Sequence, residues 1–312
     1  MKEGGLAYVA LAVRDVQAAA HVLEHRFELG RREAQTPEGH AVPLFAVGAS
    51  ALAVFACDDP FLGEGAAPGL HHLAITAANP EQKAQAAGIA GSETLASQGL
   101  DGAREVRLDS APSAGVRLRI TEPLQAAPRG GDLMQRIDHV GVASADNAAA
   151  TEFFASRLGL EVESTQTDLE VHTATESFTS DRYGIVYHNR APRIVGGLRV
   201  TFITIGDCEL EFLQPLDASG LGVPGDERAS GPGTTRGDKT AIGRYMEKHG
   251  GGLHHLALKT ADIDATLASL SQQGLSVIDA QGRPGSRRAR IGFIHPRSLS
   301  GVLVHLVERD DN

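Results

Sequence analysis

The feature that most constrains this chain is an internal repeat. The segment LAYVALAVRDVQAAAHVLEHRFELG, from Leu6 to Gly30, matches IDHVGVASADNAAATEFFASRLGL, from Ile137 to Leu160. In both, a short apolar strand is followed by an aspartate, by an Ala-rich stretch with apolar residues at helical spacing, and by Leu-Gly. Because self-similarity of this kind marks a duplicated structural unit, the sequence predicts two domains that are built alike.

A second repeated phrase carries paired histidines. PGLHHLAITAANP, from Pro68 to Pro80, returns as GGLHHLALKTADID, from Gly251 to Asp264. The stretch that begins at Gly252 also repeats the order strand, Asp, helix, Gly, strand of residues 137–162. Each domain is therefore predicted to contain two βαβββ modules, and the paired histidine belongs either to the duplicated fold or to a site.

The intervals between equivalent residues divide the chain. The interval is 131 residues from Tyr8 to His139 and 183 from His72 to His255, so the second half carries extra segments. We expect a first domain at 1–125, a linker at 126–135, and a second domain at 136–312. The extra segments form candidate loops at 165–196 and 217–243, and the second of them is rich in Gly and Ser.

Composition excludes several kinds of partner. The formal net charge of −10 argues against nucleic acid, whose binders concentrate Lys and Arg on one face. The apolar run near the N-terminus ends at Arg14, too early for a signal peptide or a membrane span. We therefore expect a cytoplasmic protein with a small-molecule substrate and no membrane partner.

The duplicated βαβββ pattern resembles the vicinal-oxygen-chelate superfamily, which includes glyoxalases, bleomycin-resistance proteins and dioxygenases. The resemblance covers both halves and implies an α+β fold, in which each domain forms a curved, cup-shaped mixed sheet around a metal site. In the second half, metal-binding residue types stand on four strands: His139, Glu211, His255 and His305. Alternation along each strand points them into one concave face, and this set suits one divalent ion: Co, Zn, Mn, Ni or Fe.

Two points about this ligand set stay open. Glu209 lies two residues from Glu211 and competes with it, and His305 is either a ligand or a base. Strand alternation sends His254 to the face opposite His255, where it packs or forms a hydrogen bond.

The first half has Tyr8, Ala53, His72 and Arg119 at the equivalent positions. One plausible ligand remains where at least three are needed, so the first domain is predicted to be metal-free and structural.

The second half resembles methylmalonyl-CoA epimerase through IDHVGVA, LGLEVE, IGDCELEFLQPLD and the closing HPRSLSGVL. The resemblance implies His139, Glu211 and His255 as ligands, while the last ligand of that family, a Glu, falls on His305. It implies an isomerase or epimerase that acts through an enolate on an acyl-CoA-like or 2-oxo acid substrate, with Glu211 and His305 as the inward catalytic candidates.

Substrate contacts are predicted on two segments. The basic run GRPGSRRARIGF offers Arg283, Arg287 and Arg288 to an anionic group, and the insertion at 165–196, a candidate lid, offers Tyr183 and Tyr187. Two other functions stay open: a non-haem Fe(II) dioxygenase of the 4-hydroxyphenylpyruvate dioxygenase type, and a non-catalytic protein that binds a small molecule. A homodimer also stays open.

Overall fold

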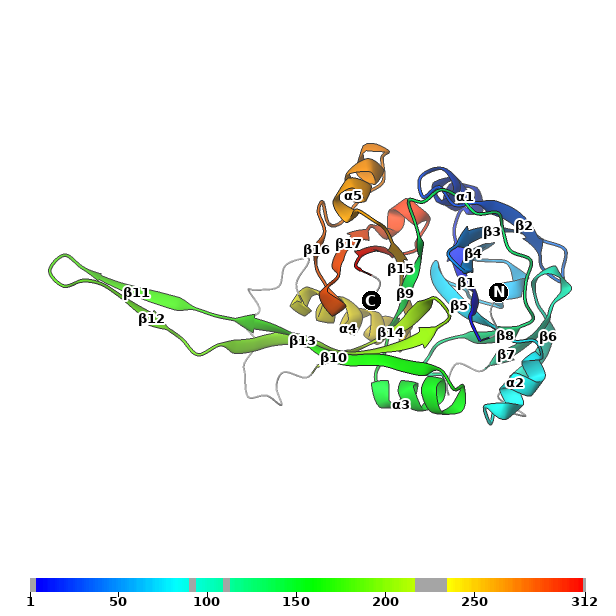
Figure 1. The fold of residues 1–312 in the computed structure, drawn as a ribbon, viewed down its shortest axis with the longest axis horizontal. Coiled ribbons are helices and arrows are strands. Elements are labelled where there is room, and N and C mark those ends of the chain that lie inside the picture. The colour runs from blue at the N-terminus through cyan, green and yellow to red at the C-terminus, as the bar shows by residue number, and fades with distance from the viewer. Residues whose placement is uncertain (1–3, 90–93, 109–112, 217–234, 311–312) are drawn as a thin grey trace.

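The structure is a computed structural model that describes residues 4–89, 94–108, 113–216 and 235–310. Within these ranges the chain forms four consecutive βαβββ modules, two in each domain (Figure 1). The first domain contains β1 (Leu6–Val13), α1 (Val16–His25), β2 (Arg31–Gln35), β3 (Ala41–Val47), β4 (Ser50–Ala56), β5 (Gly69–Thr76), α2 (Pro80–Ala86), β6 (Thr94–Gln98), β7 (Arg104–Leu108) and β8 (Leu118–Thr121).

The second domain repeats this order with additions. Its elements are β9 (Arg136–Ala143), α3 (Asn147–Thr151) with a π-helical continuation (Glu152–Arg157), β10 (Glu161–His172), β11 (Thr175–Ser180), β12 (Gly184–Asn189), β13 (Arg193–Ile205), β14 (Cys208–Pro215), α4 (Thr235–His249), β15 (Gly252–Lys259), α5 (Ile263–Gln272), β16 (Arg283–Pro284), β17 (Arg290–Ile294) and β18 (Val304–Glu308). Short 3-10 turns occupy Pro60–Leu62, Leu100–Gly102, Ser286–Arg288 and Pro296–Leu299.

Each domain forms one curled, mixed sheet. In the described part of the chain the strand orders are β2-β3-β4-β1-β5-β8-β7-β6 and β10-β13-β14-β9-β15-β18-β17-β16. The first strands of the two modules pair antiparallel at the centre of each sheet, and each pairs in parallel with the last strand of its own module. The predicted α+β fold with tandem cup-shaped sheets is confirmed.

The aspartates that follow the repeated strands cap helices. Asp15, Asp146 and Asp262 accept hydrogen bonds from backbone N–H groups in the first turns of α1, α3 and α5, and Asn79 does the same for α2. A side-chain cap of this kind stabilises a helix by about 1 kcal/mol. In the sequence, an aspartate stands repeatedly between a strand and a helix because it is the N-cap of that helix.

The two sheets share one hydrophobic core. Alternate residues of the central strands, including Val9, Leu73, Val140 and Leu256, join a single buried cluster that also contains residues of α1, α3 and α5. The opposite faces of the same strands line the two cups, as Tyr8 and Ala74 do in the first and His139 and His255 in the second. Polar contacts also cross the junction: Lys83, for example, donates to the carbonyl of Leu158, and Arg157 donates to that of Ala87.

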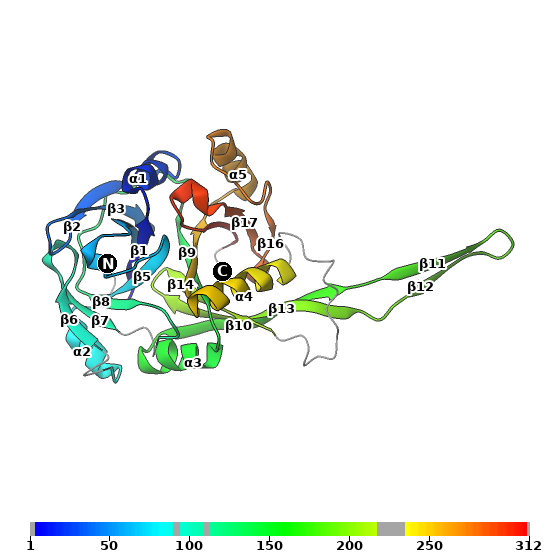
Figure 2. The ribbon, with the colours of Figure 1, turned by 180° about the vertical axis from the view of Figure 1, so that it is seen from behind.

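The insertion at 165–196 forms strands where we expected a loop. Strands β10 and β13 run past the edge of the sheet and lead into the β11–β12 hairpin, which projects as a long arm (Figures 1 and 2). Tyr183 and Tyr187 lie on this arm and are 79% and 69% exposed. Of the insertion at 217–243, residues 217–234 lie outside the described residues, and the rest begins α4. No helix in the described ranges is long and apolar enough to cross a membrane.

Candidate metal centre

Strand register brings the four predicted ligands into the second cup. His139 on β9 lies opposite Ala257 on β15, and Ala257 pairs with His305 on β18. His255 on β15 and Glu211 on β14 both lie beside Gly141 of β9, from opposite sides. A side chain at Gly141 would place its Cβ 2.1 Å from Cε1 of His255, so the imidazole needs a glycine at this position.

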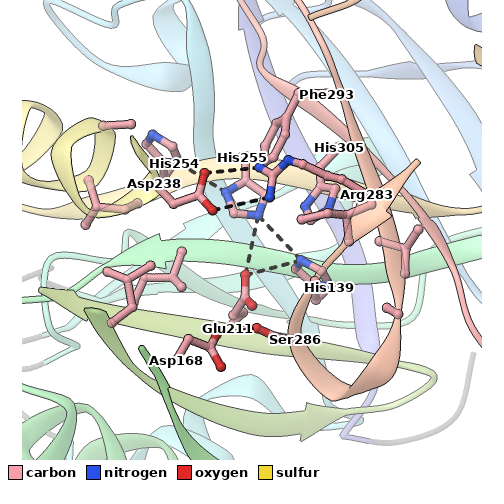
Figure 3. Close-up of a pocket in the computed structure, with 18 of the residues that line it drawn as sticks. His139, Asp168, Glu211, Asp238, His254, His255, Arg283, Ser286, Phe293 and His305 are labelled. Atoms are coloured by element: carbon pink, nitrogen blue, oxygen red, sulfur yellow. Dashed lines mark hydrogen bonds and ion pairs between the residues drawn. The ribbon is translucent and has the colours of Figure 1, made fainter. Parts of the chain in front are cut away.

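The ligand atoms converge at the floor of the cup (Figure 3). Oε2 of Glu211 lies 3.3 Å from Nε2 of His139 and 3.5 Å from Nε2 of His255, and these two nitrogens are 3.4 Å apart. One ring nitrogen from each of His139, His255 and His305 lies within 4.8 Å of the others. All four residues are buried, with no more than 5% of any residue exposed.

These residues fit a divalent cation. Both ring nitrogens of His305 are buried and have no hydrogen-bond partner among the described residues, which is costly for a polar group unless something else binds it. Ligand atoms that each lie about 2.1 Å from one ion are themselves about 3 to 3.5 Å apart. Imidazole nitrogens with one carboxylate oxygen form the donor set of borderline divalent metals. Three histidines and Glu211 would hold the ion.

The electrostatics of the cluster point the same way. Burial opposes charge on His139, but Glu211 and Asp138 outweigh it and raise the pKa of His139 to about 9. Burial lowers the pKa of His255 and, more strongly, that of His305, so both imidazoles are neutral and able to donate a lone pair. The site thus combines a carboxylate that attracts positive charge with two neutral imidazoles.

His254 does not lie where alternation places it. Its side chain lines the same cavity as His255, and the Nδ1 atoms of the two rings are 3.0 Å apart. A β-bulge causes this, because the register of β15 against β9 shifts between Leu253 and His255. The prediction that the side chain of His254 lies on the face opposite His255 is therefore wrong, whereas the predicted hydrogen bond of His254 is present.

The ligands lie in a cavity of about 790 Å³. Its walls come from β10, β13, β14, β15, β17 and from α4, which packs Ile242 against Phe202 and Leu213 inside the cup. A cavity of this size accommodates a small molecule or part of a larger one. Glu209, the competitor of Glu211, instead accepts from Arg287 and Arg309, at 3.1 and 3.2 Å.

The predicted substrate contacts separate into two groups. Arg283 and Arg287 line the cavity: Arg283 pairs with Asp238 at 3.1 Å, and Arg287 lies 3.8 Å over the ring of Phe202. Arg288 is not among the residues that line it, and Tyr183 and Tyr187 lie on the exposed arm. For these three, a role in substrate binding stays a prediction.

Several carboxylates that the sequence analysis does not name also line the cavity, among them Asp168 and Asp238. Asp168 on β10 accepts a hydrogen bond from Ser286 at 2.8 Å, and Asp238 lies in the first turn of α4. Burial raises the pKa of Asp238, although Arg283 opposes the shift. Both residues line the cavity and belong to the segments treated as loops. The alternation of side chains along a strand, which puts Gln166 and Asp168 on one face, is the sequence signal that could have identified Asp168.

The first cup is filled by its own side chains. Arg119, in the register position of His305, donates to Glu105 at 3.1 Å and to the carbonyl of Phe61 at 2.8 Å. The Tyr8 hydroxyl lies 3.2 Å from Nε2 of His72. Phe61 stacks on Phe55 beneath the Arg119 guanidinium. The polar groups of this cup therefore satisfy one another.

Comparison with known families agrees with this fold. The model of the Glyoxalase/Bleomycin resistance protein/Dioxygenase superfamily matches residues 138–293, half of the chain. The chain therefore belongs to this superfamily. The matched segment contains His139, Glu211 and His255, and it ends before His305.

Relatives of known sequence match more than half of the chain. The uncharacterized protein YqjC of Bacillus subtilis is 28% identical over 175 residues, which are 56% of this chain and 93% of YqjC. Mitochondrial methylmalonyl-CoA epimerase of Bos taurus is 23% identical over 216 residues, 65% of this chain and 98% of the epimerase.

A solved structure with two domains' length matches almost the whole chain. A mutant of 4-hydroxymandelate synthase from Streptomyces coelicolor superposes with a TM-score of 0.61 at 16% identity, covering 99% of this chain and 94% of the synthase. At this identity the likeness shows the fold alone, namely the tandem arrangement of two cups.

Proposed function

We propose that this chain is a divalent-metal-dependent isomerase or epimerase that forms an enolate from an acyl-CoA-like or 2-oxo acid substrate. The observation that carries the proposal is the convergence of three histidines and Glu211 beneath a cavity whose lining also includes Asp168 and Asp238. The identity to methylmalonyl-CoA epimerase of Bos taurus supports the same class.

His139, Glu211, His255 and His305 would hold the ion. When bound, a divalent ion supplies a Lewis acid that polarises a substrate carbonyl and favours loss of the neighbouring proton. Glu211 and His305, which the sequence nominated as catalytic, are then occupied as ligands. Proton transfer falls to groups on other walls of the cavity, as expected if the base lies in an insertion.

Asp168 and Asp238 fit that task. They lie on different walls, β10 and α4, so one carboxyl can remove the α-proton while the other delivers a proton. Burial raises the pKa of Asp238, which favours a carboxyl that carries the proton to be delivered. Ser286 donates to Oδ2 of Asp168 and Gln166 donates to Oδ1, so the carboxylate is held in place at the wall of the cavity. Arg283 and Arg287 bring positive charge to the same cavity for a carboxylate or phosphate.

The test is exchange of the α-proton into D₂O. Protein loaded with Co, Zn, Mn, Ni or Fe is incubated under nitrogen with a panel of acyl-CoA thioesters and 2-oxo acids, and deuterium is measured by NMR. Incorporation that requires both protein and metal is the expected result. Stoichiometric metal without exchange on any substrate contradicts the proposal and favours a non-catalytic binding protein.

A dioxygenase is the second candidate because two histidines and one carboxylate form the triad that non-haem Fe(II) enzymes use. The whole-chain fold match to 4-hydroxymandelate synthase is compatible with it. Such an enzyme consumes O₂ only with Fe(II), whereas an isomerase works with Co or Zn and without oxygen. An oxygen electrode separates the two: uptake dependent on Fe(II), with no deuterium exchange under nitrogen, selects the dioxygenase.

We also propose a homodimer formed through the arm. A two-stranded hairpin is marginally stable alone, and this one exposes Phe178 and Val186 on one face and Ile185 and Tyr187 on the other. A second copy offers an equal ribbon in a two-fold contact. A wild-type dimer in analytical ultracentrifugation, converted to monomer by Phe178→Ser with Tyr187→Ser, is expected. A monomeric wild type contradicts the dimer.

A further inference from the structure

Both metal-ligating strands at the centre of the second sheet carry a β-bulge beside a ligand. In β15 the register shifts between Leu253 and His255, which leaves His254 as the extra residue. In β9 it shifts between Ile137 and His139, which leaves Asp138 as the extra residue opposite Ala257 and Leu258. In each strand the residue directly before the ligand is the one that the bulge displaces.

The displacement turns these two side chains toward the cup. A regular strand sends neighbouring side chains to opposite faces, but a bulge re-aims one of them. Asp138 and His254 both line the cavity, as their neighbours His139 and His255 do. Oδ1 of Asp138 lies 2.9 Å from Nδ1 of His139, and Nδ1 of His254 lies 3.0 Å from Nδ1 of His255.

From this geometry we propose that Asp138 and His254 are positioning residues for the metal ligands. Each contacts Nδ1 of the following histidine and leaves Nε2 directed at Glu211. A ring whose Nδ1–H is engaged has the tautomer with a lone pair on Nε2, which is the form that binds a metal. The inference rests on the metal centre proposed above.

The two supports differ in strength. Asp138 is itself held by Arg136 at 3.1 Å and Arg309 at 2.9 Å, so its carboxylate is fixed and charged. His254 lies against the ring of Tyr245 on α4, 4.9 Å between centroids, and offers a neutral acceptor. His305 has no hydrogen bond of this kind among the described residues. We therefore expect the contributions to metal affinity to decrease from Asp138 to His254.

The first domain shows which part of this arrangement belongs to the fold and which part belongs to the metal site. Its central strands have the same two bulges, at Ala7 in β1 and at His71 in β5. His71 lies 2.9 Å from His72 through the same pair of Nδ1 atoms. The bulges therefore belong to the fold, whereas the carboxylate of Asp138 stands where the first domain has an alanine.

The experiment measures metal affinity without any substrate. Co(II) and Zn(II) are titrated against a chelator of known affinity into wild type, Asp138→Asn, Asp138→Ala, His254→Ala and His254→Gln. We expect about 10- to 100-fold weaker binding for Asp138→Ala and His254→Ala, with a changed visible spectrum of Co(II). Partial recovery is expected for Asp138→Asn and His254→Gln, which retain an acceptor.

His71→Ala is the matched control, because it removes the same hydrogen bond at the same bulge of the other domain. It should leave the affinity and the Co(II) spectrum unchanged. If Asp138→Ala does not fold, Asp138→Asn and both His254 variants still test the inference. Wild-type affinity in those three overturns the inference while leaving the metal centre intact, and a wild type that binds no metal removes both.

Discussion

The two cups of this molecule have the same strands, the same order of pairing and the same bulges, yet opposite interiors. Among the positions that differ, His139, Gly141, Glu211 and His305 in the second cup correspond to Tyr8, Ala10, Ala53 and Arg119 in the first. In the first cup, the buried charges of Arg119 and Glu105 form an ion pair with each other. In the second, the ring nitrogens of His305 have no hydrogen-bond partner among the residues that the structure describes. The fold alone therefore does not make the site, and a few inward residues decide between a filled core and a metal centre.

The largest expected difference concerns proton transfer. Asp168→Asn or Asp238→Asn should slow α-proton exchange by about 100- to 10,000-fold, because each removes a group that transfers a proton. Metal content should stay at the wild-type level, since neither carboxylate belongs to the ligand cluster. Deuterium exchange and metal analysis of the same samples check both points. Wild-type exchange in both variants would show that other groups transfer the proton.

Substitutions in the first cup should change the stability of the protein and leave its metal content unchanged. Arg119→Met leaves Glu105 buried without its closest cationic partner and should destabilise the fold by about 3 to 5 kcal/mol. Urea unfolding measures this loss. Arg119→Met combined with Glu105→Leu should recover much of it, because no buried charge is left unpaired. A single variant as stable as wild type contradicts this description of the first cup.

Metal removal should destabilise the second cup. A ligand that binds only the folded state stabilises it by about 2.7 kcal/mol when present at 100 times its Kd. Thermal unfolding with metal and with excess chelator should therefore differ by several degrees. The variant His255→Ala provides the control, since its unfolding should not respond to the chelator. An identical response of wild type and His255→Ala would speak against metal bound at this cluster.

A smaller effect is expected from the glycine beneath His255. Gly141→Ala places a Cβ within 2.1 to 2.5 Å of three ring atoms, so the imidazole must move and metal binding should weaken by about 10-fold. Ala10→Gly, the equivalent exchange in the first cup, should reduce stability by about 1 kcal/mol and leave metal binding unchanged. Metal titration and urea unfolding compare the pair. Equal metal affinity in Gly141→Ala and wild type would show that the ring tolerates the shift.

The sequence predicted what depends on periodicity. The repeats and the inward strand positions are local patterns, and together with the resemblance to the vicinal-oxygen-chelate superfamily they predicted the fold and the convergence of His139, Glu211, His255 and His305. The face of His254 did not follow, because a bulge breaks the period without any mark in the sequence.

The two insertions at 165–196 and 217–243, for which the sequence predicts loops, were harder to interpret. Asp238 reaches the cavity because α4 packs across the cup, a tertiary contact that no local pattern records. Tyr183 and Tyr187 were placed near the site by their position in an insertion, but that insertion continues two strands away from the sheet. Length alone could not show the direction in which it extends.

The central claim is that one cup binds metal and the other does not, and metal analysis of a matched pair tests it most directly. Inductively coupled plasma measurement on protein purified without a His tag should give one divalent ion per chain for wild type. The same value is expected for His72→Ala and a value near zero for His255→Ala, because these histidines occupy equivalent positions in the two sheets. Full occupancy in His255→Ala, or loss of the ion in His72→Ala, would contradict the account.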